Sequence, residues 1–320
     1  MRKRAALVTH TRTGRILLTG ADRRSYLQGL LSNDLEALGP GTGCYATMLT
    51  AQGRMITDMR VLELGDSVLL DVPEEVVTSV RDHLDRFVFT EDVAVQDVSA
   101  TRGEIGLYGP RAGDGLAAAG VEGGVPDTLF ASARVRIAGA DAVLVRSDSP
   151  GIRGFDIIAA PADLPAIEAA FIAAGAVRAS DADIESVRIE SGRPRFGADM
   201  DADTIPLEAG LEERAISRTK GCYVGQEVIV RVLDRGHGRV ARRLVGLTLP
   251  AASPIPPPGK RLQAGGKDVG RVTSAVFSPA LARPVALGYA QRDFVEPGTH
   301  VEIEGSGEAV VTPLPLVPLE

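Results

Sequence analysis

The stretch of the sequence best suited to chemistry is residues 220–227, which read Lys-Gly-Cys-Tyr-Val-Gly-Gln-Glu. Cys222 lies two positions after Lys220, and a nearby ammonium group together with backbone N–H groups favours the thiolate form of a cysteine. A thiolate attacks electrophiles, binds metals or responds to oxidation, whereas an isolated cysteine is more often a small buried apolar side chain. Cys222 has no neighbouring Cys or His, so it cannot hold an iron–sulfur cluster unless a partner supplies further ligands.

The other residues of this octapeptide are expected to shape the loop around Cys222. Gly221 and Gly225 would allow unusual backbone angles and the close approach of a ligand. Tyr223 either packs against a flat ligand ring or anchors the loop. Gln226 and Glu227 are expected to cap a helix or to bond to the loop backbone.

Charge is segregated around the octapeptide. Residues 199–213 hold six acidic residues and no basic ones: Asp199, Asp201, Asp203, Glu208, Glu212 and Glu213. Residues 214–243 hold eight basic residues against two acidic ones: Arg214, Arg218, Lys220, Arg231, Arg235, Arg239, Arg242 and Arg243. This pattern indicates either a seam of ion pairs between domains or a site for an anionic ligand or RNA.

The composition of the 320-residue chain is that of a globular protein with two or three domains, 44% hydrophobic and 24% charged. Its formal net charge of −7 argues against a general nucleic-acid binder. Its two cysteines lie far apart, which fits a reducing cytoplasm, and Cys44 is expected to be structural. No apolar run completes a signal peptide or approaches the ~20 residues of a membrane span. No metal-ligand spacing links the four histidines, His10, His83, His237 and His300.

Hydrophobic periodicity predicts an α+β fold with antiparallel sheets. Strands are expected at residues 15–20, 55–64, 68–72, 93–98, 103–109, 135–146 and 154–160, and helices at residues 22–31, 74–89, 165–174 and 179–191. A further helix is expected after residue 110, through residue 119. Residues 50–160 then hold two βαβ-like passes of one subdomain.

The rest of the chain is irregular and then β-rich. Residues 192–238 form a long stretch without periodicity, which is typical of a functional or disordered segment. The proline cluster at residues 250–258 predicts a linker or a stiff turn. Short strands between turn signals over residues 260–304 predict a small β-barrel or sandwich.

Several motifs carry a resemblance to a known family. Residues 190–201, 205–211 and 220–227 resemble the YgfZ branch of the glycine-cleavage T-protein superfamily. Residues 20–34 and 107–110 match the same superfamily, so the resemblance covers nearly the whole chain. The octapeptide is its most specific part, because it separates this branch from true aminomethyltransferases.

The resemblance implies a three-domain cloverleaf around a central folate channel, with antiparallel-sheet α/β domains and a small C-terminal β-barrel. The expected domains are residues 1–50 with 161–240, residues 51–160, and residues 241–320. The implied function is a cytoplasmic accessory protein for iron–sulfur cluster assembly or repair. Its ligand would be tetrahydrofolate or a one-carbon derivative, its partners iron–sulfur proteins or assembly factors, and Cys222 its functional thiol.

The resemblance also assigns ligand-binding residues. A pterin-reading carboxylate falls at Glu190, where two oxygens can accept two adjacent N–H donors. The alternative is a helix-surface Glu190 that pairs with Arg188 or Arg193. Lys220 and Arg231 would bind the carboxylates of the folate's glutamate tail, or the phosphate of another partner.

T-proteins carry two adjacent acids where this chain has Thr57 and Asp58, and one of those acids is thought to act on the reactive folate nitrogens. Asp58 is therefore the candidate acid, against the alternative of a solvated aspartate at a strand end. The missing acid argues against the first alternative function, a tetrahydrofolate-dependent aminomethyl- or formyl-transferase. The second alternative is a partner in tRNA modification that uses the basic stretch at residues 214–243.

Overall fold

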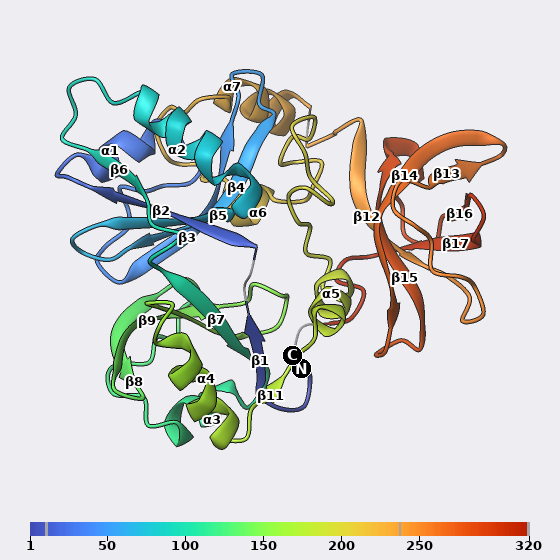
Figure 1. Ribbon diagram of the computed structural model, residues 1–320. Coiled ribbons are helices and arrows are strands. Elements are labelled where there is room, and N and C mark those ends of the chain that lie inside the picture. The colour runs from blue at the N-terminus through green and yellow to red at the C-terminus, as the bar shows by residue number, and fades with distance from the viewer. Residues whose placement is uncertain (10–11, 237, 319–320) are drawn as a thin grey trace. The chain divides into compact units, whose positions relative to one another are not determined.

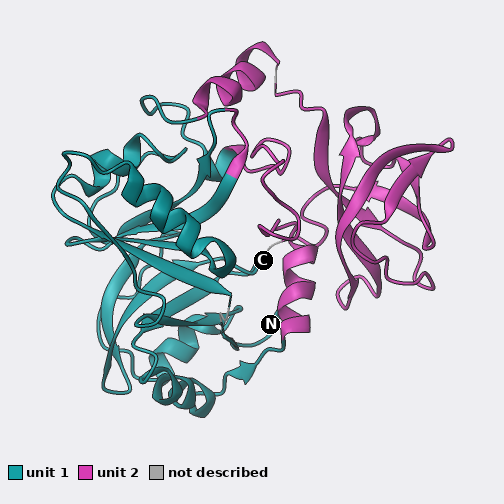
Figure 2. Cartoon of the chain, turned by 45° about the horizontal axis from the view of Figure 1, so that its top comes forward, with its two compact units in different colours: residues 1–51, 56–180, 213–224 teal, residues 52–55, 181–212, 225–320 magenta. Residues whose placement is uncertain are grey.

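The computed structural model describes residues 1–9, 12–236 and 238–318, which leaves His10 and His237 outside the described residues. The chain divides into two compact units (Figure 2). Unit 1 comprises residues 1–51, 56–180 and 213–224, and unit 2 comprises residues 52–55, 181–212 and 225–320.

Unit 1 contains an antiparallel sheet in the order β3-β4-β5-β2-β6, with helices over one face (Figure 1). Its strands are β2 (Thr13–Thr19), β3 (Thr42–Leu49), β4 (Met55–Glu63), β5 (Val68–Pro73) and β6 (Ala94–Asp97). The helices are α1 (Arg23–Gln28) and α2 (Val77–Arg86), the latter preceded by the short 3₁₀ turn η1 (Glu74–Val76). Apolar side chains of both helices and of the strands bury one core between them.

A second sheet of unit 1 has the order β11-β1-β7-β10-β9-β8. Its strands are β1 (Ala6–Thr9), β7 (Gly103–Tyr108), β8 (Ser132–Ile137), β9 (Ala140–Ser147), β10 (Gly154–Ala159) and β11 (Val177–Arg178). Helices α3 (Ala112–Ala118) and α4 (Leu164–Ala173) cover one face and share its core. The two sheets meet through a smaller apolar cluster of Leu62, Leu69, Val145 and Ile158.

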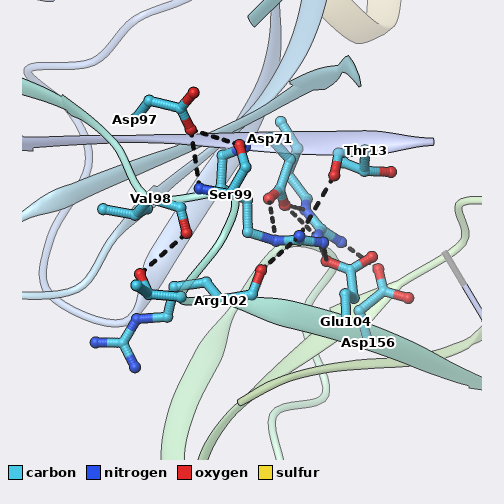
Figure 3. Close-up of polar contacts among 11 residues, drawn as sticks. Thr13, Asp71, Asp97, Val98, Ser99, Arg102, Glu104 and Asp156 are labelled. Atoms are coloured by element: carbon cyan, nitrogen blue, oxygen red, sulfur yellow. Dashed lines mark hydrogen bonds and ion pairs between the residues drawn. The ribbon is translucent and has the colours of Figure 1, made fainter. Parts of the chain in front are cut away.

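A buried ion network also joins the two sheets (Figure 3). On the first sheet, Arg60 donates through Nε to Asp71 at 2.7 Å. Arg60 also reaches two acids of the second sheet: it contacts Asp156 and donates through Nη2 to Glu104 at 2.7 Å. Arg15 lies 3.3 Å from Asp71 and 3.2 Å from Glu104. Charges this deeply buried persist in proteins only when they are paired, so the network fixes how the two sheets pack.

Unit 2 contains a closed barrel in the order β12-β15-β14-β13-β16-β17. Its strands are β12 (Arg242–Thr248), β13 (Arg261–Ala264), β14 (Lys267–Ser278), β15 (Arg283–Gln291), β16 (His300–Ile303) and β17 (Gly307–Thr312). Its other elements are α5 (Asp181–Glu190), α7 (Gln226–Val230), a π-helical turn η2 (Arg231–Arg235) and the 3₁₀ turn η3 (Arg292–Phe294). The short helix α6 (Glu212–Ala215) begins at the last residue of this segment of unit 2, and its other residues belong to unit 1. Helix α5 packs on the barrel through the buried Ile189.

The predicted α+β class with antiparallel sheets and a C-terminal β-barrel is confirmed. The expected boundary at residue 50/51 is not a boundary between sheets, because β4 and β5 pair with β2 and lie beside β3. The boundary at residue 160/161 likewise separates α4 and β11 from the sheet on which they pack. The two βαβ-like passes therefore belong to two different sheets.

Other local predictions also differ from the structure. The single strand expected over residues 135–146 is a hairpin, β8 and β9, because Ala138 and Gly139 take left-handed φ values of 52° and 83° at its turn. The proline-rich residues 250–258 join β12 to β13 within the barrel, so of the two expected roles they are a turn within a domain and not a linker between domains. Strands β1 and β3 were not predicted. Across the described part of the chain, no helix has both the length and the hydrophobicity needed to cross a bilayer.

Candidate functional site

Strand β4 places Asp58 on the face of the first sheet that is turned toward the second. Side chains alternate along a strand, so Asp58, Arg60 and Leu62 share one face. Leu62 lies in the apolar contact between the two sheets, and Arg60 lies in the ion network. Asp58 is the next residue along the same face of β4. Thr57 and Met59 lie on the opposite face, where Met59 joins the core beneath the helices.

The Asp58 carboxyl group is only partly satisfied. The Tyr45 hydroxyl donates a hydrogen bond to Oδ2 of Asp58. Oδ1 is buried and has no hydrogen-bond partner among the described residues. Burial raises the pKa of Asp58, although the Tyr45 bond, a bond from its own backbone and the charge of Arg214 oppose that rise. A buried oxygen without a donor is destabilising, so this position favours a ligand that brings an N–H or O–H group.

Arg214 of α6 is held beside this carboxyl group. Its guanidinium donates two hydrogen bonds to Asp148, at 2.9 and 2.6 Å. It also lies over two aromatic rings, 5.1 Å from the centroid of Tyr45 and 5.2 Å from that of Phe130. Burial alone would lower the pKa of Arg214, but the bond to Asp148 and nearby negative charge raise it. Arg214 is therefore a fixed cation.

Phe130 adopts an unusual backbone conformation at this point. Its φ of 65° lies in the left-handed region, which bulky residues rarely occupy. Its side chain is only 8% exposed beneath the Arg214 guanidinium. Backbone strain of this kind is concentrated at binding and catalytic sites.

Lys220 lies elsewhere in unit 1 and is buried. Its Nζ donates to the carbonyl oxygens of Gln28, Leu31 and Asn33 at 2.6, 2.5 and 3.0 Å, and lies 5.0 Å from the centroid of the Tyr223 ring. Burial lowers its pKa to about 8. Three carbonyl contacts use all three ammonium donors, so in this structure Lys220 fastens the octapeptide to the end of α1 and the loop after it.

The rest of the octapeptide is divided between the two units, with residues 220–224 in unit 1 and residues 225–227 in unit 2. Cys222 is exposed, whereas Tyr223 is buried at 7% exposure. Burial raises the pKa of Tyr223 to about 12. The buried ring anchors the loop, which was one of the two roles expected of it.

The two glycines of the octapeptide differ. Gly225 has a φ of 83° and precedes α7, so a left-handed residue is needed there. Gly221 lies outside the left-handed region, and a Cβ atom there would meet nothing within 4 Å, so the expected unusual backbone is wrong at Gly221. Gln226 and Glu227 are the first residues of α7, and the N-cap is Gly225 without a side-chain cap bond, so the expected capping by either residue is wrong. The negative charge of Glu227 nevertheless suits the helix N-terminus.

Glu190 ends α5 in unit 2 and is 2% exposed, so it is not the helix-surface residue that one interpretation expected. Its Oε1 accepts hydrogen bonds from the Ser278 hydroxyl at 2.5 Å and the Ala280 amide at 3.3 Å. Arg188 donates to Asp199 at 2.6 Å. Glu190 is therefore a fixed, buried carboxylate.

The segregated charges form ion pairs within each unit. Of the eight basic residues, Arg214 pairs with Asp148, and Lys220 bonds to carbonyls. Four further pairs in unit 2 engage the acidic stretch: Arg242 with Glu208, Arg243 with Glu212, Arg271 with Asp201 and Arg54 with Asp203. Arg231 remains exposed at the start of η2. The charges thus form ion pairs, as one interpretation expected, but these pairs lie within the units and do not make the expected seam between domains. Fewer cations are left for RNA.

Sequence reasoning missed Tyr45, Phe130 and Asp148, and counted Arg214 only as one of a basic stretch. No spacing rule links these positions, because strand β3, the segment before β8, the β9–β10 loop and α6 bring them together. One signal was available: Asp58 is a charged residue in the middle of β4, between the apolar Ile56 and Met59 with only Thr57 intervening.

Comparisons with known proteins agree with this architecture. Residues 1–220 match the GCVT N-terminal domain, and residues 242–317 match the glycine cleavage T-protein C-terminal barrel domain. An aminomethyltransferase of Saccharopolyspora erythraea is 30% identical over 97% of this chain and 85% of its own length. Another from Thermus thermophilus is 30% identical over 96% of this chain and 85% of its own length.

A solved structure has the same fold. The glycine cleavage system aminomethyltransferase T from Bartonella henselae superposes with a TM-score of 0.87 at 24% identity, and the alignment covers 99% of this chain and 87% of that one. Both parts of the chain thus match one family in sequence, and the fold agrees. The chain belongs to the glycine cleavage T-protein family.

Proposed function

We propose that this protein binds tetrahydrofolate, or a one-carbon derivative of it, and acts as a one-carbon transferase of the aminomethyl class. The proposal gives the alternative function more weight than the iron–sulfur accessory role, because the relatives are named aminomethyltransferases. The single observation that carries it is the carboxyl group of the half-buried Asp58, whose Oδ1 is buried and has no hydrogen-bond partner among the described residues.

A carboxyl group of this kind suits chemistry at a folate nitrogen. Tetrahydrofolate supplies the nitrogens that carry one-carbon units. Oδ1 of Asp58 would accept an N–H there, and burial raises the pKa of this carboxyl group, which favours a part for it in proton transfer.

The lack of a second acid at position 57 is a weaker argument against transferase activity than the sequence suggested. Thr57 is 0% exposed and lies on the opposite face of β4 from Asp58. An acid at position 57 would therefore point away from the Asp58 carboxyl group.

Glu190 is proposed to read the pterin ring. Its burial excludes competing water, and the hydrogen bond from Ser278 holds the carboxylate in one orientation. Arg231, exposed on η2, is proposed to bind the glutamate tail. Lys220 is the weaker candidate for that role, because its donors already bond to carbonyls.

Calorimetric titration with tetrahydrofolate tests binding. We expect wild type to bind, and Glu190→Ala to lose at least about tenfold in affinity through the loss of charged hydrogen bonds. Glu302→Ala, an exposed residue of β16, is the matched control and should bind like wild type. Absence of wild-type binding would overturn the proposed function, and full affinity in Glu190→Ala would overturn the pterin assignment.

Transfer needs a separate assay. Wild type supplied with an aminomethyl-loaded lipoylated carrier protein and tetrahydrofolate should release ammonia and methylene-folate, and Asp58→Asn should not. Folate binding without either product would reject the transferase proposal.

That outcome would favour a second candidate, the accessory role in iron–sulfur assembly of the YgfZ branch. The octapeptide and the exposed thiol of Cys222 support this role. If it is correct, Cys222→Ser should reduce the activity of iron–sulfur enzymes in cells, while Cys44→Ser should not.

A further inference from the structure

We propose that Tyr45 and Arg214 are positioning residues: together they orient the Asp58 carboxyl group so that Oδ1 is the atom offered to the ligand. The proposal rests on the proposed function only for the identity of that ligand. Three contacts support the proposal, and they run from Asp148 to Arg214, from Arg214 to Tyr45 and from Tyr45 to Asp58.

The first contact fixes the carboxyl group. Tyr45 on β3 and Asp58 on the neighbouring β4 lie on the same face of the sheet, where the hydroxyl donates to Oδ2. Because a carboxylate has two equivalent oxygens, the occupation of one of them determines the direction of the other. Oδ1 is thereby left buried without a donor among the residues that the structure describes.

The second contact fixes the phenol ring. The Arg214 guanidinium lies 5.1 Å from the Tyr45 centroid, a cation–π contact that restrains the ring. Asn33 joins the two backbones, because its Nδ2 donates to the Tyr45 carbonyl at 2.8 Å and to the Arg214 carbonyl at 3.5 Å.

The third contact fixes the cation. Two hydrogen bonds from Arg214 to Asp148 hold the planar guanidinium in one orientation. The Phe130 ring lies 5.2 Å from the guanidinium and supplies a second aromatic contact. Arg214 is thus restrained by a carboxylate and by two rings, so it cannot rotate away from Tyr45 without breaking these contacts.

The charged and titratable groups around Asp58 come from several elements. They are Tyr45 on β3, Arg214 on α6 with Asp148 behind it, and Arg60 two residues along β4. Both Tyr45, through its hydrogen bond, and Arg214, through its charge, favour the ionised form of Asp58. Loss of either should shift the titration of Asp58 to higher pH.

Carbon-13 NMR of the aspartate carboxyl groups in the free protein measures this directly. We expect Tyr45→Phe, which keeps the ring under Arg214, to shift the titration of Asp58 upward. Arg214→Gln should shift it in the same direction. Tyr26→Phe is the matched control, because the Tyr26 hydroxyl donates to the Leu84 carbonyl on the other side of the sheet.

Folate affinity gives the second measurement. Tyr45→Phe should bind tetrahydrofolate about tenfold more weakly than wild type at neutral pH, since it loses one charge-assisted hydrogen bond. As pH falls, Tyr45→Phe should begin to lose tetrahydrofolate binding at a higher pH than wild type does. Tyr26→Phe should match wild type in both respects.

The outcomes separate the two proposals. If Asp58 titrates in Tyr45→Phe as it does in wild type, the positioning inference is wrong whether or not folate binds. If wild type binds no folate while the NMR shift is observed, the proposed function fails and the positioning inference stands. Should Tyr45→Phe fail to fold, the Arg214→Gln titration decides, and an unshifted Asp58 there rejects the inference.

Discussion

Two polar regions lie next to each other on one face of β4, and they differ in whether their charged groups form ion pairs. Around Arg60, each of five buried charged residues takes part in an ion pair: Arg15, Arg60, Asp71, Glu104 and Asp156. Two residues away, Asp58 has one satisfied oxygen and one buried oxygen with no partner among the described residues. A paired network stabilises one arrangement of the sheets, whereas an incomplete one is available to a ligand.

The strongest way to break this comparison is to remove Arg60. Arg60→Met leaves three buried carboxylates without their shared cation, so we expect unfolding free energy to fall by about 3–5 kcal/mol. Urea denaturation measures the loss. A variant as stable as wild type would show that the network contributes nothing to the packing of the sheets.

Asp58→Asn should affect activity and not stability, in contrast to Arg60→Met. Removal of a poorly solvated charge leaves stability equal to or above that of wild type, while transfer activity falls at least about a hundredfold with the loss of an acid–base group. Denaturation and product assays on the same preparation check both expectations. A large loss of stability with activity retained would reverse the roles assigned to the two regions.

Lys220 is a third buried charge, and its donors are satisfied. Lys220→Met should lower unfolding free energy by about 2 kcal/mol, since three carbonyl groups lose a charged donor. Lys267→Met, at an exposed position of β14, should change it by less than about 0.5 kcal/mol. Equal stability of the two variants would contradict a fastening role for Lys220.

The smallest expected effect is a pH dependence of stability. Folding raises the pKa of Asp58 from its ordinary value of 3.8, so the folded state binds the proton more tightly than the unfolded state. Wild type should therefore lose stability relative to Asp58→Asn as pH rises from about 4 through the raised pKa. Paired denaturation series across that range measure the difference, and parallel curves would show that Asp58 titrates normally.

Part of this picture was predictable from the sequence. The β4–β5 hairpin follows from two apolar runs around Gly65 and Asp66, and the structure confirms it. Asp58 was identified as the candidate acid from the resemblance to T-proteins, which carry two adjacent acids at this position. The network was not predicted, because it depends on register: Asp71 lies opposite both Arg15 and Arg60 on neighbouring strands. Local periodicity specifies strands, but it does not specify which strands meet.

The same limit explains the missing site residues. Tyr45, Asp148 and Arg214 lie in three separate parts of the chain, and only tertiary packing brings them together. Strand pairing across the expected domain bounds has a similar cause. The sheet of β3 continues through β4 and β5 after residue 50, and α4 and β11 after residue 160 still pack on the second sheet.

The conformation of Phe130 limits which residues can replace it. A β-branched residue would increase the strain of a φ of 65°, which for such a position is of the order of 1–3 kcal/mol. Glycine would relieve the backbone but remove the ring beneath Arg214. Few amino acids can satisfy both demands, so we expect this position to tolerate little exchange although it touches Asp58 only through Arg214 and Tyr45.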